Sequence, residues 1–323
     1  MLKQHFPSSG FIEAGDQSGH RLYYEEYGPK DQPAFVMAHG NAGYLFDPQK
    51  LSMWDFDKQH VVIMHARGVG KSQPAAKVDQ NLYPDLMQDI EVVRQQLNLG
   101  KINLFGWSGG AAVSLLYAQT YPQNCKGLVL YGAYLGADQE LMDYYARNAR
   151  KYPDGWARFC KHYGETHTAL LIRKSNDVLV NGTADEKLQA AVQYELIFEP
   201  ASVTSEILLK RHSAWEWQNL VNSRIVFANM MNKAYGLTPD QIENNLPLLG
   251  DIPVLFVNGA NDHVTPASVA QRLAGKISCA HTVVIDPADH DVHNPWVQTM
   301  LGQLLADFPP PKPSAPQPQS LRL

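Results

Sequence analysis

The chain has 323 residues, of which 45% are hydrophobic, and its formal net charge is −5. This length supports one large or two modest globular domains, and the charge gives no electrostatic basis for binding nucleic acid or an anionic membrane. No run of about 18 apolar residues is present that would span a bilayer, and the first residues lack the apolar core of a signal peptide.

The cysteines bear on the compartment and on metal binding. Cys125, Cys160 and Cys279 are odd in number and widely spaced, which fits reduced thiols in a cytoplasmic protein better than a disulfide framework. The sequence contains no Cys-x-x-Cys pair that would suggest zinc. We therefore predict a cytoplasmic protein and no metal site.

Short apolar segments alternate with amphipathic helical segments along the chain. The spacing of apolar residues predicts helices over residues 84–97 and 111–119. The first two strand segments are half polar, as at an antiparallel edge, whereas the later ones are continuously apolar. This pattern predicts an α/β fold with a mostly parallel, eight-stranded sheet and helices on both faces. The predicted strands span residues 11–14, 21–27, 34–38, 61–64, 102–105, 128–131, 254–257 and 282–285.

The segment between the sixth and seventh predicted strands has a different character. Residues 137–247 have a helical pattern that is rich in Tyr, Trp, Arg and Asn, with no obvious buried strand. We predict that they form a helical cap inserted into a core made of residues 1–136 and 248–308. Residues 309–323 are rich in proline and lack core-forming side chains, so we predict a disordered tail.

The most informative motif is Gly106-Trp107-Ser108-Gly109-Gly110, which follows an apolar strand and precedes a helix rich in small residues. A G-x-S-x-G sequence in this setting is typical of a nucleophile elbow, in which a tight turn lifts the serine hydroxyl above the sheet edge. The glycines two residues before and after Ser108 leave room for that turn. If the pentapeptide is considered alone, the alternative to a nucleophile elbow is a Gly-rich turn that happens to contain a serine.

A nucleophilic serine needs a base, and the base needs an acid that orients it. In the fold that an elbow implies, the partners follow in the order Ser, then Asp or Glu, then His. Asp262 follows the strand over residues 254–257, and His290 follows the strand over residues 282–285. Because the ends of parallel strands converge at one edge of a sheet, we predict that Ser108, Asp262 and His290 meet there.

Each partner has an alternative. Asp262 could cap a turn or a helix, since Pro266 soon follows. His263 and His293 compete with His290 for the role of base, and the spacing His290-x-x-His293 beside two aspartates could also suggest a metal cluster. A complete set of serine, base and acid explains the region without a metal.

Acyl transfer also needs two N–H groups that bind the developing oxyanion. One is expected from Gly109, directly after the serine, and the other from Asn41, in the loop after the strand over residues 34–38. This chemistry requires no cofactor. The expected partner is a small molecule or a short peptide.

At this point the chain resembles the proline iminopeptidases, a family of serine peptidases in the α/β-hydrolase superfamily. The resemblance runs from Ser9 to Asp307 and implies an α/β-hydrolase fold and release of an N-terminal residue such as proline. The segments that match the family are Gly10-Phe11-Ile12, His20-Arg21-Leu22-Tyr23-Tyr24-Glu25, His39-Gly40-Asn41-Ala42-Gly43, Arg67-Gly68-Val69-Gly70-Lys71-Ser72, Tyr117-Ala118-Gln119-Thr120-Tyr121-Pro122 and Trp215-Glu216.

The Trp-Glu motif matters for the substrate. In the family its glutamate binds the substrate's free amino group, so the resemblance implies that Glu216 and Trp215 are substrate-binding residues. The alternative is that Glu216 lies on the surface of a helix while Trp215 and Trp217 pack within the cap.

Four departures from the family pattern keep other functions open. The elbow reads Gly-Trp-Ser-Gly-Gly instead of Gly-Gly-Ser-Trp-Gly, His65 replaces an aspartate, and Asn41-Ala42 replaces Gly-Pro. The family's second amine-binding glutamate should fall near Met231 and is absent. An esterase or acyl hydrolase acting on a small neutral metabolite is therefore one alternative. A ligand-binding receptor that reuses the hydrolase fold is the other.

Overall fold

The computed structural model describes residues 8–38, 51–309 and 320–322. Its strands form one sheet with the order β1-β2-β4-β3-β5-β6-β7-β8-β9. The pairs β1–β2 and β2–β4 are antiparallel, and every other neighbouring pair is parallel, which confirms the predicted mostly parallel sheet. The strands are β1 (Ser8–Glu13), β2 (Arg21–Tyr27), β3 (Phe35–Ala38), β4 (Val61–Met64), β5 (Ile102–Trp107), β6 (Cys125–Tyr131), β7 (Val254–Gly259), β8 (Ala280–Ile285) and β9 (Ser320–Arg322).

The ninth strand differs from the prediction of eight strands followed by a disordered tail over residues 309–323. β9 lies parallel to β8, with Thr282 opposite Ser320. Without it, β8 would present a row of unpaired backbone groups at the sheet edge. Ser320–Arg322 follow the last proline, and each of them carries the backbone N–H that proline lacks. Residues 310–319, which directly precede β9, lie outside the described residues.

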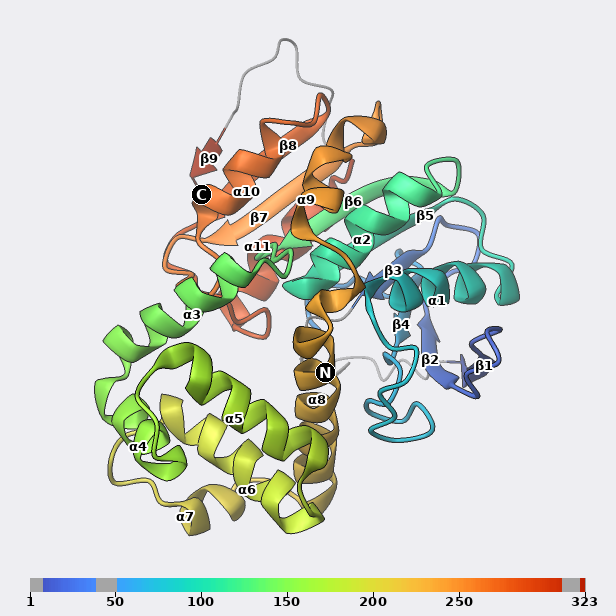
Figure 1. The fold of residues 1–323 in the computed structure, drawn as a ribbon. Helices are drawn as coiled ribbons and strands as arrows, with labels where there is room; N and C mark the ends of the chain where they lie inside the picture. Colours follow the sequence, from blue (N-terminus) through green and yellow to red (C-terminus); the bar gives the residue numbers. More distant parts are fainter. Residues whose placement is uncertain (1–7, 39–50, 310–319, 323) are drawn as a thin grey trace.

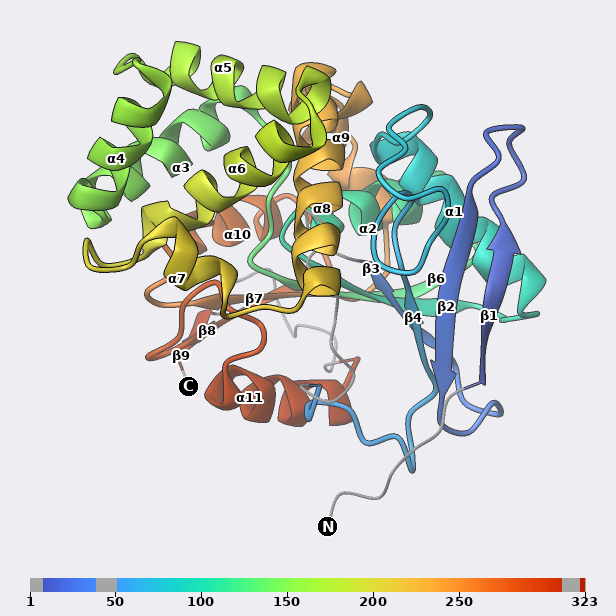
Figure 2. The same ribbon diagram turned by 90° about the horizontal axis from the view of Figure 1, so that it is seen from below.

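Helices cover both faces of the sheet, as predicted. Helices α1 (Tyr83–Gln96), α2 (Gly109–Thr120) and α10 (Ala267–Ala274) lie on one face, and α11 (Pro295–Ala306) lies on the other (Figure 1, Figure 2). The period of two along each strand sends alternate side chains to the two faces. In β5, for example, Leu104 joins the core under α1 and α2, whereas Phe105 joins the core against α11.

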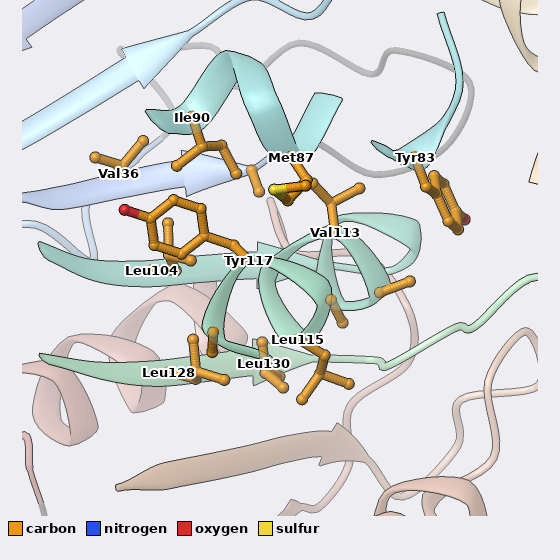
Figure 3. Close-up of a cluster of buried hydrophobic side chains, with 14 of the residues drawn as sticks. Val36, Tyr83, Met87, Ile90, Leu104, Val113, Leu115, Tyr117, Leu128 and Leu130 are labelled. Carbon is orange, nitrogen blue, oxygen red and sulfur yellow. The ribbon is translucent and has the colours of Figure 1, made fainter. Parts of the chain in front are cut away.

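Figure 3 shows the core on the α1 and α2 side, where strand residues such as Val36 and Leu104 face Ile90 of α1 and Tyr117 of α2. These four side chains are at most 1% exposed. Burial of this kind removes aliphatic and aromatic surface from water, which stabilises the fold by about 25 cal/mol per Å² of apolar area. The continuous apolar strands of the sequence therefore have a simple cause, since both of their faces are buried.

A helical segment separates β6 from β7 in the chain. Helices α3–α7 form a layer apart from the sheet, and α8 lies between that layer and the part of the core around α1 (Figure 1, Figure 2). The helices are α3 (Asp138–Lys151), α4 (Pro153–Tyr163), α5 (Thr168–Asn181), α6 (Ala184–Glu195), α7 (Ser205–Leu209), α8 (Ala214–Asn232) and α9 (Pro239–Asn244). No helix in the described ranges is long and apolar enough to cross a membrane.

A buried carboxylate joins α1 to α2. Glu91 is 4% exposed at its side chain and binds Arg94 at 2.7 Å, while the Tyr117 hydroxyl donates to it at 2.8 Å. Burial acts against ionisation, but the hydrogen bonds from Arg94 and Tyr117 prevail and lower the pKa of Glu91 to about 2. Because this pKa lies below that of an unfolded glutamate, ionised Glu91 stabilises the fold above about pH 4.3.

We predict that Glu91→Gln lowers the free energy of unfolding at pH 7 by about 1–3 kcal/mol, because charge-assisted hydrogen bonds are lost. Denaturant unfolding at a series of pH values checks this. The difference from the wild type should shrink as the pH falls from about 4.3 toward 2, as the wild-type carboxylate itself becomes protonated. Glu206→Gln removes an exposed pair with Lys210 and serves as the control. An equal effect of both substitutions would contradict the prediction.

Candidate active site

Ser108 occupies a strained turn between β5 and α2. Its backbone φ is 53° and its ψ is −122°, a positive φ that a residue with a side chain seldom adopts. The Ser108 N–H donates to the Tyr131 carbonyl at 2.9 Å, which ties the turn to the end of β6. A Cβ on Gly106 would lie 2.7 Å from the Gly110 carbonyl oxygen, so the first glycine of the motif allows α2 to pass close to β5.

Asp262 lies in the loop after β7 and is 5% exposed. Backbone N–H groups of Val264 and Thr265 donate to its Oδ1 at 2.9 and 2.8 Å, and the Thr265 hydroxyl donates to Oδ2 at 2.9 Å. Burial alone would raise the pKa of Asp262, but the nearby His290 and the hydrogen bonds from Thr265 lower it below its usual range. The loop therefore holds Asp262 as a carboxylate.

His290 lies in the loop after β8, and its Nδ1 is 2.8 Å from Oδ2 of Asp262. Two core side chains hold this loop through its backbone. The Trp107 indole N–H donates to the His290 carbonyl at 3.1 Å, and the Tyr131 hydroxyl donates to the Asp289 carbonyl. Gly132 leaves the space for the ring, since a Cβ there would lie 2.9 Å from its Nδ1.

The structure thus brings Asp262 and His290 into contact, and His290 and Ser108 line the same pocket. The competing histidines also line it but have other partners. His263 is 3.0 Å from Lys151 through its Nδ1, and His293 packs its ring edge-on against Trp107. Among the described residues, no three His, Cys, Asp or Glu side chains are grouped so that they could hold a metal ion.

Of the two residues predicted for the oxyanion hole, the structure describes Gly109 and does not describe Asn41. Gly109 is the first residue of α2, where backbone N–H groups have no acceptor within the helix and favour negative charge. Asn41 lies outside the described residues.

The pocket above Ser108 has a volume of about 570 Å³ and lies between the strand ends and the inserted helices. Aromatic side chains from the core and from α3, α6 and α8 form a large part of its wall, and charged side chains and histidines line the rest together with a few small or aliphatic ones. The aromatic side chains that line it are Trp107, Tyr134, Tyr144, Tyr152, Tyr194, Phe198 and Phe227. Such a wall suits a small ligand with an apolar part.

One ion pair lines this pocket. Glu195, at the end of α6, accepts a hydrogen bond from Arg224 of α8 at 2.6 Å. The Arg224 guanidinium also lies 3.8 Å above the centre of the Tyr194 ring. The arginine therefore offsets the charge of the carboxylate.

Trp215 and Glu216 are not brought to the pocket. Glu216 accepts from the Ser213 N–H at 2.7 Å and so completes the capping box at the start of α8, and Trp215 is 53% exposed. The geometry matches the alternative in which Glu216 is a helix residue at the surface. Of the two tryptophans that this alternative packs within the cap, Trp217 is buried and Trp215 is not. Among the inserted helices, the carboxylate that lines the pocket is Glu195, which also follows an aromatic residue, Tyr194. That pattern recurs in Phe198-Glu199, so it does not identify Glu195 in the sequence.

Comparison with known proteins identifies the family to which the chain belongs. A model of the alpha/beta hydrolase fold matches residues 33–294. The chain is 30% identical to a proline iminopeptidase of Neisseria gonorrhoeae, over 96% of this chain and 98% of the relative. It is 27% identical to a proline iminopeptidase of Arabidopsis thaliana, over 91% of this chain and 78% of the relative.

Solved structures agree on the fold. An esterase from Thermogutta terrifontis has a TM-score of 0.59 and 18% identity, with 93% of this chain and 97% of that chain covered. Identity at this level shows a shared fold, and the activity has to be inferred from the residues of the site. The matched family model and the extent of the similarity to the Neisseria protein show that this chain belongs to the α/β-hydrolase fold family, as a serine hydrolase of the proline iminopeptidase type.

Proposed function

We propose that the enzyme cleaves an amide or ester bond of a small substrate through Ser108, His290 and Asp262. The observation that carries the proposal is the 2.8 Å contact between His290 and Asp262 in the pocket that Ser108 lines. His290 takes the proton of the Ser108 hydroxyl as the serine attacks the carbonyl carbon. Asp262 holds the imidazole tautomer and stabilises the imidazolium that forms.

The remaining steps of the reaction use the same groups. The Gly109 N–H, together with that of Asn41, binds the oxyanion of the tetrahedral intermediate, and each such donor contributes roughly 2.7–4 kcal/mol. His290 then gives its proton to the leaving group, which departs and leaves an acyl group on Ser108. A water molecule deprotonated by His290 attacks this ester, and the acid is released as Ser108 regains its proton.

For the substrate, we propose release of an N-terminal residue such as proline from a short peptide or amide. The name of the relatives supports this activity, and the aromatic wall of the pocket suits a compact ring such as that of proline. Three carboxylates line the pocket: Asp289 and Asp291, which flank His290, and Glu195, at the end of α6. We assign the binding of a free amino group to Glu195, which lies on the inserted helices.

Cleavage of a small neutral ester is the second candidate, and the ion pair favours it. Arg224 already occupies one oxygen of Glu195 at 2.6 Å and offsets its charge. A cationic amine near this pair meets a guanidinium as well as a carboxylate, so the electrostatic preference for a charged amine is reduced.

We also propose that the enzyme works in the cytoplasm. All three cysteines are free thiols, and Cys125 and Cys279 are buried. Burial raises the pKa of Cys125 to about 12, which keeps this thiol protonated and unreactive.

Replacement of the serine tests the proposed nucleophile. Ser108→Ala should lower kcat/KM for the best substrate by about 10⁴-fold or more, because covalent catalysis is lost while the fold remains. Steady-state kinetics and labelling by a fluorophosphonate probe measure this. Ser114→Ala, in the same helix, should keep the label. Hydrolysis by the Ser108→Ala protein at a near wild-type rate would refute the assignment.

Replacement of the acid tests the proposed role of Asp262. Asp262→Asn should lower kcat by roughly 10³–10⁴-fold with little change in KM, because the amide no longer favours the productive tautomer of His290. Asp286→Asn changes an exposed carboxylate in the loop that carries His290 and should leave kcat within about twofold, as is usual for surface changes. Equal kinetics for the two variants would rule out Asp262 as the acid.

A pair of substrates tests the need for a free amine. We expect hydrolysis of proline 2-naphthylamide. Acetylation of the free amine in its pyrrolidine ring should lower kcat/KM by roughly 100-fold or more, since the hydrogen bond from this amine to Glu195 is then lost. Both amides are assayed beside p-nitrophenyl acetate. If both amides are inert while the acetate is hydrolysed, the esterase function is correct and the aminopeptidase function is not.

A further inference from the structure

Helix α3 contacts the loop that carries Asp262. Arg147, in the last part of this helix, donates from its Nη2 to the Val264 carbonyl at 2.8 Å and from its Nε to the His263 carbonyl. On the same side of the helix, Lys151 contacts the His263 ring at 3.0 Å. In Figure 1, α3 runs from the edge of the sheet toward the other inserted helices.

The two carbonyls that Arg147 binds belong to particular peptide units. The His263 carbonyl shares its peptide with the Val264 N–H, and the Val264 carbonyl shares its peptide with the Thr265 N–H. These same two N–H groups donate to Oδ1 of Asp262, at 2.9 and 2.8 Å. Each peptide therefore has a guanidinium at its oxygen and a carboxylate at its hydrogen.

This arrangement has an electrostatic consequence. A hydrogen bond to a carbonyl oxygen polarises the peptide and makes its N–H a stronger donor, so bonds in such a chain strengthen one another. Burial lowers the pKa of Arg147 below its ordinary value, but an arginine remains protonated at neutral pH. The positive charge therefore acts on Asp262 through two aligned peptides and also fixes where those peptides lie.

We propose that Arg147 is a positioning residue, which holds and polarises the two peptides that orient Asp262 toward His290. The proposal rests on the function proposed for Ser108, His290 and Asp262. It makes the inserted helical segment part of the catalytic arrangement in addition to its place in the pocket wall. A displaced Asp262 would misalign the base, and a misplacement of about 1 Å can slow a reaction by as much as 100-fold.

The test uses Arg147→Met, which keeps an unbranched apolar stem and removes the guanidinium. We expect kcat for p-nitrophenyl acetate to fall roughly 10- to 100-fold with KM nearly unchanged, because the substrate is still bound while the base is misaligned. Arg147→Lys should recover part of kcat, since an ammonium can bind one of the carbonyls. Arg150→Met removes the same charge from an exposed position of the same helix and should match the wild type.

Chemical rescue adds a measurement that does not depend on the packing of the methionine. In Arg147→Ala, added guanidinium at millimolar concentration should raise kcat, and urea at the same concentration should not. Wild-type values of kcat and KM in Arg147→Met would overturn the proposal for Arg147, and so would a loss that neither lysine nor guanidinium restores. If Ser108→Ala remains active, the proposed nucleophile is overturned first, and the positioning role falls with it.

Discussion

The candidate site depends on how closely α2 approaches the end of β5. A side chain at position 106 would collide with the backbone of α2, so only glycine permits the approach. The positive φ that this imposes on Ser108 costs on the order of 1–3 kcal/mol. Hydrogen bonds on both sides of the serine hold it there, since its N–H donates to Tyr131 and its carbonyl accepts from Tyr134. The position of Ser108 is thus fixed by the last residue of β6 and by the loop that follows this strand.

The parallel sheet then brings the other chemical groups to the same edge. Each of the loops after β7 and β8 is held by a different part of the molecule. Trp107 and Tyr131 of the core bind the backbone around His290. Arg147 of the inserted helices binds the backbone beside Asp262. The alignment of acid and base therefore involves the core and the inserted helices, whereas the turn at Ser108 is held by β5, α2 and the end of β6 with its following loop.

The parts that the sequence predicted are those set by local pattern. Buried strands read as apolar runs, so their ends could be located, and Ser108, Asp262 and His290 each follow such an end. The parts it did not predict depend on tertiary placement. Arg147 contacts residues more than a hundred positions away in the chain. Glu195 and Glu216 have the same kind of aromatic neighbour, and only the packing of α6 and α8 decides which carboxylate reaches the pocket.

The last strand has a consequence for the behaviour of the protein in concentrated solution. β8 contains Thr282, Val283 and Val284, which favour extended structure, and β9 pairs with its outer side. A chain cut before Ser320 would leave the backbone donors and acceptors of this strand open to pairing with another molecule. The short C-terminal strand thus protects the sheet edge from association with another molecule. This role is unrelated to catalysis, and it depends on three residues that follow a proline-rich sequence.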